Sequence, residues 1–542
     1  MLSRHRIAVA AIPVLTLGAA LYGCEPQTAP GPGVETSAAP AQTGVASQPI
    51  EDRACSYPSM PFPAPISAEM PYDVDLARKK ALEDQGAFPD VQRLFDIYSW
   101  QTFIALNWPA DREGNPERAR KLGDKGRRVW ETWKEAFEVY LPTGADPAPW
   151  GTRTVPPESG ASPEDRLLRM SFKKNRAHAG VADETSQAFS GPLVDQHGKW
   201  VRYEVVMNRE EFDYVVTQKF YYIEGQIEFS KSGKKVEFPS GKGVEKKRGA
   251  MELKLAWKEM DPGDIKGRFY TTSALILDAK GAWIRKEMGL VGMHIAVKTE
   301  SAPTWVWATF EQVDNVDTNP VEKVVGNDGK LTAIKPSFNN ADRSAAATPV
   351  NVLPPKTGTV NDACNGATPI WDEATTKTPV QVTRVIPIPA DKRQLNCEVQ
   401  RALKGTVFQY YQLIDTQWPT QPKPLAAAGK PGQGSAPGSV VNKSPGNVVP
   451  VFLTNTTMES YFQIGNQHAG PEEEGSPPDS TLIFGTESCT GCHYSAGIAD
   501  GWTPSPGGGA VKCAQFGGAG NGDFSWLMSQ KASFRDPKAA GK

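Results

Sequence analysis

Three residues that can do chemistry lie within five positions near the C-terminus, in Cys489-Thr490-Gly491-Cys492-His493. The chain has seven cysteines and six histidines in 542 residues, so composition alone does not explain this grouping. Two thiols separated by two residues can add to the two vinyl groups of one porphyrin, and the histidine that follows can bind the iron. The spacing therefore predicts one covalent haem c, attached through Cys489 and Cys492, with His493 as an axial metal ligand.

Two other uses of a Cys-x-x-Cys pair compete with this interpretation. A structural zinc site needs four Cys or His ligands, usually in two paired clusters, and Cys513 is the one further candidate nearby. A thioredoxin-like redox dithiol is the second alternative, because residues 481–485 upstream of the motif could form a strand. The following histidine favours haem over both.

The sixth iron ligand has several candidates, because methionine and histidine both serve in electron-transfer cytochromes. Met458 lies in a segment, Asn455–Gln463, that the sequence predicts to be helical. The other candidates are Met528, His468 and His294. His294 lies on an apolar strand, where a histidine is more typical of the core than of a metal site. The polar, loop-like sequence around His178 and His197 predicts that both lie at the surface.

The N-terminus has the pattern of an export signal. Arg4 and Arg6 precede an apolar run that ends in Leu21-Tyr22-Gly23-Cys24. The run of about fifteen residues is short of the roughly twenty that a spanning helix needs, although an uncut membrane anchor is the alternative. The ending resembles a bacterial lipoprotein signal, so we expect Cys24 to carry the lipid. The protein is then expected on the periplasmic face of the cell envelope. Residue 25 is glutamate and not the aspartate associated with retention in the inner membrane, so the outer membrane is favoured.

Four other cysteines would be oxidised in such a compartment. Cys55, Cys364, Cys397 and Cys513 allow three pairings. Cys364 with Cys397 is the local choice, which leaves Cys55 for Cys513.

The formal net charge of −2 is mildly acidic, and no basic stretch suggests nucleic acid as a partner.

Composition and periodicity divide the chain into six predicted parts. Residues 1–23 are the signal peptide, and 24–50, rich in Pro, Ala, Gly and Ser, are a disordered tether. Four parts follow: a Trp-rich helical region (51–190), a β-rich domain (191–316), a loop-rich connection (317–404) and a haem module (405–542) with a flexible insert at 419–450. The predicted fold class is α+β, with a mostly antiparallel sheet in the middle and a mainly helical and loop-like haem module.

Side-chain periodicity supports these assignments. Aromatic residues recur at helical spacing in 129–142 and again in 98–109. In 250–260, apolar and charged residues alternate, which is typical of a half-buried strand. Further strands are expected in 200–208, 268–277, 292–299 and 304–310.

Seven motifs occur in an order that resembles a known group. They are SWQTFIALNWP, VWETWKEAFEVYLP, LVGMHIAVKT, TWVWATFEQVDN, NTTMESYFQ, SCTGCH and DFSWL. The chain resembles, over Phe95 to Gln530, uncharacterised bacterial exported proteins labelled cytochrome c family proteins. The resemblance implies a single covalent haem and electron transfer, and it favours Met458 over Met528 as the sixth ligand. One departure is Gln312, where the pattern has histidine, which puts a role of that strand at the iron in doubt.

These observations predict a cell-envelope mono-haem cytochrome that passes single electrons between redox partners, either proteins or small molecules. Its membrane contact would be the N-terminal lipid. Holding one haem takes roughly a hundred residues, so most of this chain must serve another purpose. Two alternatives therefore stay open: a haem-dependent oxidoreductase with an open iron site, and a binding protein in which haem is mainly structural.

Overall fold

The computed structural model describes the following residues: 60–168, 191–316, 323–340, 349–364, 366–418, 424–425, 436–437, 453–461, 463, 489–494, 496–508, 511–517 and 521–537. The predicted signal peptide and tether lie outside the described residues, as do Cys24, Cys55, His178 and His468. Among the described helices, none is both long enough and apolar enough to cross a bilayer.

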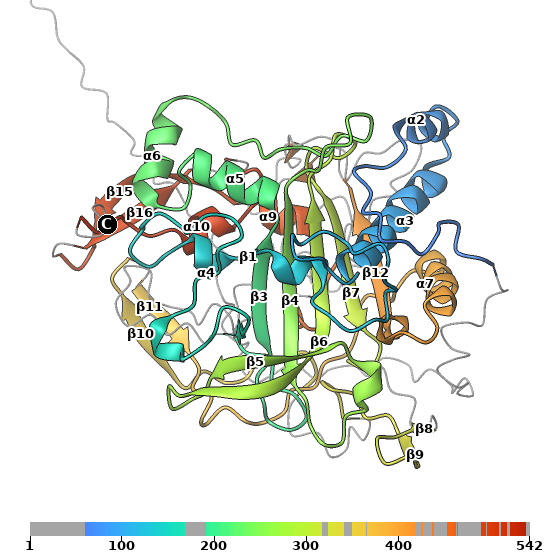
Figure 1. Cartoon of the computed structure of the whole chain (residues 1–542). Helices are drawn as coiled ribbons and strands as arrows, with labels where there is room; N and C mark the ends of the chain where they lie inside the picture. Colours follow the sequence, from blue (N-terminus) through green and yellow to red (C-terminus); the bar gives the residue numbers. More distant parts are fainter. Residues whose placement is uncertain are drawn as a thin grey trace, which may run out of the picture. The chain divides into compact units, whose positions relative to one another are not determined.

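A curled sheet of eight strands organises the chain (Figure 1). Its strands are β1 (Lys134–Glu135), β2 (Arg166–Leu168), β3 (Arg202–Met207), β4 (Met251–Glu259), β5 (Thr271–Leu277), β6 (Trp283–Val297), β7 (Val306–Gln312) and β12 (Tyr411–Gln417). The order is β1-β3-β4-β6-β5-β2, and β7 lies between β6 and β12. Every pairing is antiparallel except that of β2 with β5, so the sheet is mixed.

The fifteen-residue strand β6 connects the two halves of this sheet. Its first half pairs with β5 and its second half with β7, while β4 runs along its other edge. Alternation along the strands gives the sheet two different faces. On β4, Leu253 and Leu255 are buried on one face, and Glu252 and Lys254 lie on the other.

Helices cover the apolar face. They are α2 (Leu76–Asp84), α3 (Phe88–Leu106) and α7 (Ala390–Ala402), grouped on one side of the sheet in Figure 1. Phe103 of α3 stacks on Phe310 of β7 at 4.4 Å between ring centroids. Trp100 packs edge-on against the same phenylalanine at 4.9 Å. Full burial of such rings contributes about 2–3 kcal/mol each, so this core anchors the sheet.

Shorter elements cover the second face. They are α4 (Ala136–Val139), α5 (Arg209–Thr217), α6 (Ile223–Lys231), α9 (Cys489–Tyr494) and α10 (Leu527–Lys531) (Figure 1). An apolar cluster at one end of this face includes Trp307, Phe524 and Met528. A second cluster, at the other end, includes Met458, Val291 and Ala256. Between these two apolar clusters, the same face of the sheet carries the polar pair Lys254 and His294.

The predicted fold class is wrong. Of the residues that the structure describes, 26% are in strands and 23% in helices, so this part is β-rich with a mixed sheet rather than α+β with helical ends. The described C-terminal residues are not mainly helical: α9 and α10 have six and five residues, and a hairpin of β15 (Ala499–Pro504) and β16 (Lys512–Phe516) lies between them. The large sheet also takes β12 from the predicted haem module.

The aromatic spacing in 129–142 misled the helix prediction. This segment is a 3₁₀ turn, Val129–Thr132, followed by β1 and the four-residue α4. Trp130 and Trp133 pack into the core on the α3 side, whereas Tyr140 packs into the cluster of Trp307. The chain crosses from one core to the other here, so the spacing did not report a single helical face.

The helix expected over Asn455–Gln463 is also absent from the described part of that segment, which forms turns. Its polar side chains bind β7 instead of capping a helix. Asn455 Nδ2 donates to Thr309 Oγ1 at 2.9 Å and to the Phe310 carbonyl at 3.0 Å. The Thr456 hydroxyl donates to Glu311 Oε2 at 2.6 Å. By contrast, the helix predicted in 98–109 (the end of α3) and the five middle strands are confirmed.

The favoured disulfide pairing is wrong. Cys364 bonds to Cys513, 149 positions away, and Cys397 is disulfide-bonded as well. Cys364 follows β10 (Gly358–Asp362), whose partner is β11 (Gly366–Ile370), and Cys513 lies on β16. The bond therefore joins two hairpins, which no local spacing reveals. The remaining small hairpins are β8 (Lys323–Val325) with β9 (Leu331–Ala333) and β13 (Pro424–Leu425) with β14 (Ala436–Pro437).

Candidate haem-binding site

The helix α9 carries the whole Cys-x-x-Cys-His motif. Residues three and four apart share one face of a helix, so Cys489, Cys492 and His493 lie on the same side of one turn. The backbone N–H of Thr490 donates to Gln417 Oε1 on β12 at 2.8 Å. This hydrogen bond fastens the start of the motif helix to the edge of the large sheet.

Both motif cysteines are thiols, whereas Cys364, Cys397 and Cys513 are in disulfides. Cys489 is partly buried between two apolar clusters, and its Sγ lies 3.7 Å from the Leu453 carbonyl oxygen. Burial raises the pKa of the Cys489 thiol far above its usual range. A redox dithiol instead needs a lowered pKa and an exposed thiolate. The surroundings therefore favour thioether attachment over the thioredoxin-like alternative.

The His493 ring is held in one orientation. Its Nδ1 lies 2.7 Å from the carbonyl oxygen of Phe524, and the ring packs on Trp307 at 4.4 Å between centroids. A carbonyl can only accept, so Nδ1 carries the proton and Nε2 keeps its lone pair for a metal. Burial lowers the pKa of His493 to about 4, which keeps the imidazole neutral as a ligand must be.

The backbone that supports this contact adopts unusual conformations. Trp305, Asp523 and Phe524 have φ values of 69°, 46° and 70°, in the left-handed region that bulky residues avoid. Trp305 Nε1 donates to the Asp523 carbonyl at 3.0 Å, and Phe238 N donates to Asp523 Oδ2 at 2.7 Å. Lys298 forms an ion pair with the same carboxylate. Such conformations cost about 1–3 kcal/mol each and concentrate at functional sites.

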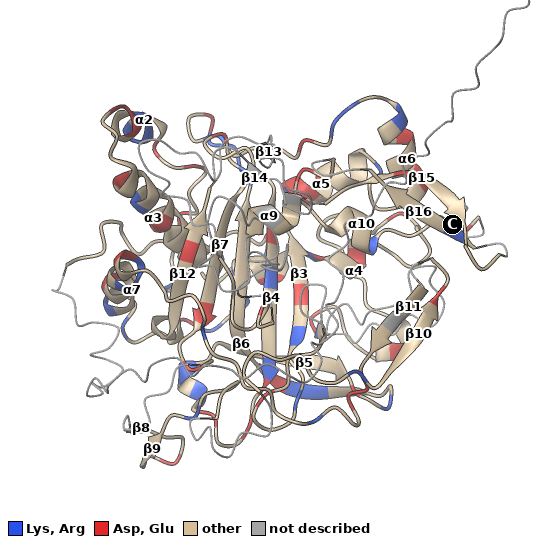
Figure 2. Ribbon diagram, turned by 180° about the vertical axis from the view of Figure 1, so that it is seen from behind, with Lys and Arg blue, Asp and Glu red and all other residues tan. Residues whose placement is uncertain are grey.

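Charged groups lie on the sheet face beneath α9. Lys254 of β4 is directly opposite His294 of β6, and His294 Nε2 lies 3.4 Å from Glu459 Oε2. Figure 2 shows both signs of charge along β3 and β4 near α9. Burial alone would raise the pKa of Glu459, but His294 and Lys254 outweigh it and lower the pKa. Burial lowers the pKa of Lys254, and Glu459 and Glu252 oppose that shift.

The candidate sixth ligands differ in their place along β6. Met458 is fully buried, with its Cε beside Gly292, whereas Trp307, which holds the His493 ring, pairs with Ala296. Four residues of strand separate these positions by about 13 Å. His294 lies on the same face of β6, two residues from Gly292 and two residues from Ala296.

Met528 and Gln312 are placed differently. Met528 is buried in the apolar cluster of α10, where Gln226 donates to its carbonyl at 2.9 Å. Gln312 is buried on β7 and follows Phe310 by two residues, so it faces the α3 side, away from the motif. Its amide donates to the Arg268 carbonyl at 3.2 Å.

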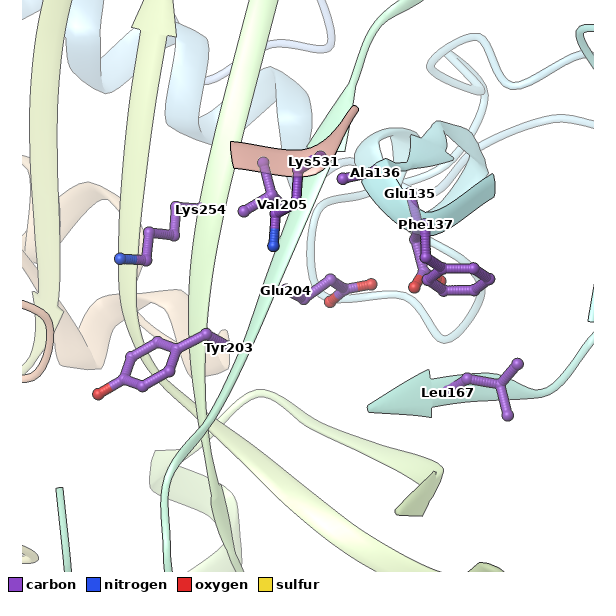
Figure 3. A pocket seen from close by; sticks show the side chains of 9 residues that line it. All are labelled: Glu135, Ala136, Phe137, Leu167, Tyr203, Glu204, Val205, Lys254 and Lys531. Carbon is purple, nitrogen blue, oxygen red and sulfur yellow. The ribbon is translucent and has the colours of Figure 1, made fainter. Parts of the chain in front are cut away.

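A small cavity lies on the same face of the sheet, lined in part by Lys254 (Figure 3). Its volume of about 30 Å³ has room for a water or two, not for an organic substrate. Lys254 Nζ lies over the Tyr203 ring at 5.2 Å, and Figure 3 shows the Glu204 carboxylate directed toward Glu135. The cavity therefore suits hydration of buried charge rather than catalysis on a bound molecule.

The residues present fit a covalent haem: two thiols and one neutral, oriented imidazole share a helix face. The supporting residues Trp307, Phe524, Lys254 and Glu459 were missed as site residues. Trp307 and Phe524 belong to TWVWATFEQVDN and DFSWL, so those strings were the available signal.

Comparisons with family models, curated proteins and solved structures gave no match for this chain.

Proposed function

We propose that this protein is a cell-envelope mono-haem c-type cytochrome that passes single electrons between redox partners. One observation carries the proposal: the Phe524 carbonyl fixes the protonated nitrogen of His493, on the helix face that also presents two thiols. When bound, haem c supplies a one-electron iron couple. Cys489 and Cys492 would hold it covalently, and His493 Nε2 would be the axial ligand.

The surroundings support electron transfer better than catalysis. An oriented, partly buried imidazole keeps its position in both oxidation states, which keeps reorganisation small. The cavity near Lys254 is too small for a substrate. The alternative, a haem enzyme with an open iron, stays distinguishable, because an open site binds carbon monoxide readily.

Covalent attachment is the first test. A haem-stained denaturing gel and an intact mass should show one haem on each chain, and Cys489→Ser/Cys492→Ser should lose it. Cys364→Ser/Cys513→Ser is the matched control and should keep the stain. Loss of all haem from the wild type on denaturation would contradict the proposal. A redox titration should then follow a one-electron curve.

Location is part of the same proposal. The export-type pattern that ends in Leu21-Tyr22-Gly23-Cys24 supports a place on the periplasmic face, as an outer-membrane lipoprotein with lipid on Cys24. Cys24→Ser should then release the protein from the membrane fraction and disturb its processing. Recovery of the wild type as a soluble protein cut elsewhere would refute the anchor.

A further inference from the structure

A second polar cluster lies where β3 begins and β4 ends. Asp195 and His197 belong to the turn that precedes β3, and Asp261 belongs to the turn that follows β4. Because β3 and β4 are antiparallel neighbours, the start of one strand meets the end of the other. The topology thus brings together three side chains that can bind a metal ion.

The three side chains lie at distances suited to one ion. One ligand atom from each lies within 4.8 Å of the others, and His197 Nδ1 is 2.9 Å from Asp261 Oδ2. A tetrahedral ion with nitrogen and oxygen ligands at about 2.0–2.2 Å holds those ligands about 3.3–3.6 Å apart. Changes of up to about 1.5 Å in these separations would complete the site.

Two carboxylate oxygens in this cluster have no hydrogen bond. Asp195 is fully buried, and its Oδ1 accepts from the backbone N–H groups of His197 and Lys199 at 2.8 and 2.9 Å. Asp195 Oδ2 is buried without any donor. Asp261 Oδ2 also has no hydrogen bond, although His197 Nδ1 lies 2.9 Å away. Such buried acceptors cost about 1–3 kcal/mol each unless a cation satisfies them.

The nearby ammonium groups bind other atoms. Lys199 Nζ lies 2.7 Å from Asp261 Oδ1 and 3.0 Å from Glu259 Oε1. Lys258 Nζ lies 2.7 Å from Asp264 Oδ1. These contacts do not involve Asp195 Oδ2 or Asp261 Oδ2. The neighbouring His197 imidazole is half-exposed, so the cluster is open to solvent on that side.

We propose that Asp195 Oδ2, Asp261 Oδ2 and His197 Nδ1 bind one divalent transition-metal ion, with water completing the coordination on the exposed side of His197. An imidazole ligand disfavours Ca²⁺ and Mg²⁺, and the lack of a thiolate disfavours Cu(I), so Zn²⁺ is the apt probe. The ion would tie the turn before β3 to the turn after β4. This proposal is independent of haem.

Zinc binding to the chelator-treated, haem-loaded full chain tests it. Titration calorimetry with ZnCl₂ should show one site, and the thermal midpoint should rise by a few degrees. His197→Gln should weaken binding at least tenfold and remove the thermal shift. Because His197 is half-exposed, this variant should keep the wild-type circular dichroism and haem spectra. Asp195→Asn should abolish binding, and the exposed Asp84→Asn on α2 should change nothing.

Two results would overturn the proposal. One is an unchanged zinc affinity in His197→Gln, which would show that the zinc binds to thiols or carboxylates elsewhere on the chain. The other is the absence of a zinc response in the wild type. An equal response to MgCl₂ would overturn the assigned class of ion.

Discussion

At the scale of single residues, the site depends on how firmly His493 is held. Its ring lies between the Trp307 indole and the Phe524 carbonyl, which are 217 positions apart in the sequence but adjacent in space. The thiols and the imidazole could be predicted from spacing alone, because one helical turn sets their geometry. The roles of Trp307 and Phe524 could not be predicted, because both residues reach His493 only where β7 and the DFSWL turn meet in the folded chain.

The sixth ligand is the first prediction at this scale. Met458 is favoured by a motif match, and its side chain packs beside Gly292, about 13 Å along β6 from the Trp307 row. His294 lies midway between these positions, and its Nε2, which has no hydrogen bond, is 3.4 Å from Glu459 Oε2. We therefore expect His294→Ala to open the iron to carbon monoxide, measured by the absorption spectrum. Met458→Ala should cost about 2–5 kcal/mol of stability without changing ligation.

The spectra also say what would reverse this expectation. A ferric sulfur-to-iron charge-transfer band in the near infrared, lost in Met458→Ala and kept in His294→Ala, would establish Met458 as the ligand. Met528→Ala is the matched control, because Met528 is equally buried and lies in another apolar cluster. It should leave the ligation unchanged.

Asp523 gives a prediction about pH. Burial raises the pKa of Asp523 to about 6, although Lys298 opposes the shift. Between about pH 4 and 6 the folded chain keeps a proton that the unfolded chain loses. The free energy of unfolding should therefore fall as pH rises through this window, by up to about 3 kcal/mol, and level off above it.

Denaturant unfolding across pH 4–7 measures this effect. Asp523→Asn cannot titrate, so its stability should fall less steeply from pH 4 to 6 than that of the wild type. Its lower overall stability, caused by the unpaired Lys298, does not affect that slope. Asp328→Asn, on the exposed turn between β8 and β9, should keep the wild-type slope. An unchanged slope in Asp523→Asn would contradict the assignment.

At the scale of elements, the Cys364–Cys513 bond joins the β10–β11 hairpin to the β15–β16 hairpin that follows α9. The Ser505 hydroxyl also donates to the Ala363 carbonyl at 2.6 Å. In the chain-entropy model a loop of this length is worth about 5 kcal/mol, and measured losses are typically 2–5. Cys364→Ala/Cys513→Ala should lose about that much stability in denaturant unfolding, with unchanged haem content.

The matched control is Thr503→Ala, an exposed residue opposite Cys513 on β15. It should lose little stability. If the double cysteine variant also sheds haem, the hairpin contributes to the site itself and the prediction of a purely mechanical role fails.

Elements were predictable where one face of a segment meets a single environment. The alternation in β4 is clear because Leu253 and Leu255 enter the core while Glu252 and Lys254 face polar surroundings. Residues 129–142 failed because successive aromatic side chains serve two different cores. The turns around Asn455 failed because long-range bonds to β7 replaced the local caps. Periodicity reports the environment of a segment, not which distant partner supplies it.

At the scale of the whole molecule, the apolar core on the α3 side is built independently of the motif. The described members of that core all lie between Ala68 and Trp418. Among the described side chains of α9, Cys489 alone joins an apolar cluster, and it is only partly buried there. The large sheet therefore does not depend on the motif helix for its packing.

The last prediction follows from this independence. Cys489→Ser/Cys492→Ser, which cannot attach haem, should keep the far-ultraviolet circular dichroism of the wild type and unfold cooperatively, with loss of redox activity. The physical reason is that the α3-side core supplies the stability and α9 adds few apolar contacts. A modest drop in the thermal midpoint is expected, because the variant loses the contacts that bound haem would make with α9 and the residues around it. A variant that unfolds without a cooperative transition would show that haem holds the fold together, which is the structural alternative. The Cys364→Ala/Cys513→Ala variant provides the converse case, in which stability falls while haem and redox activity stay.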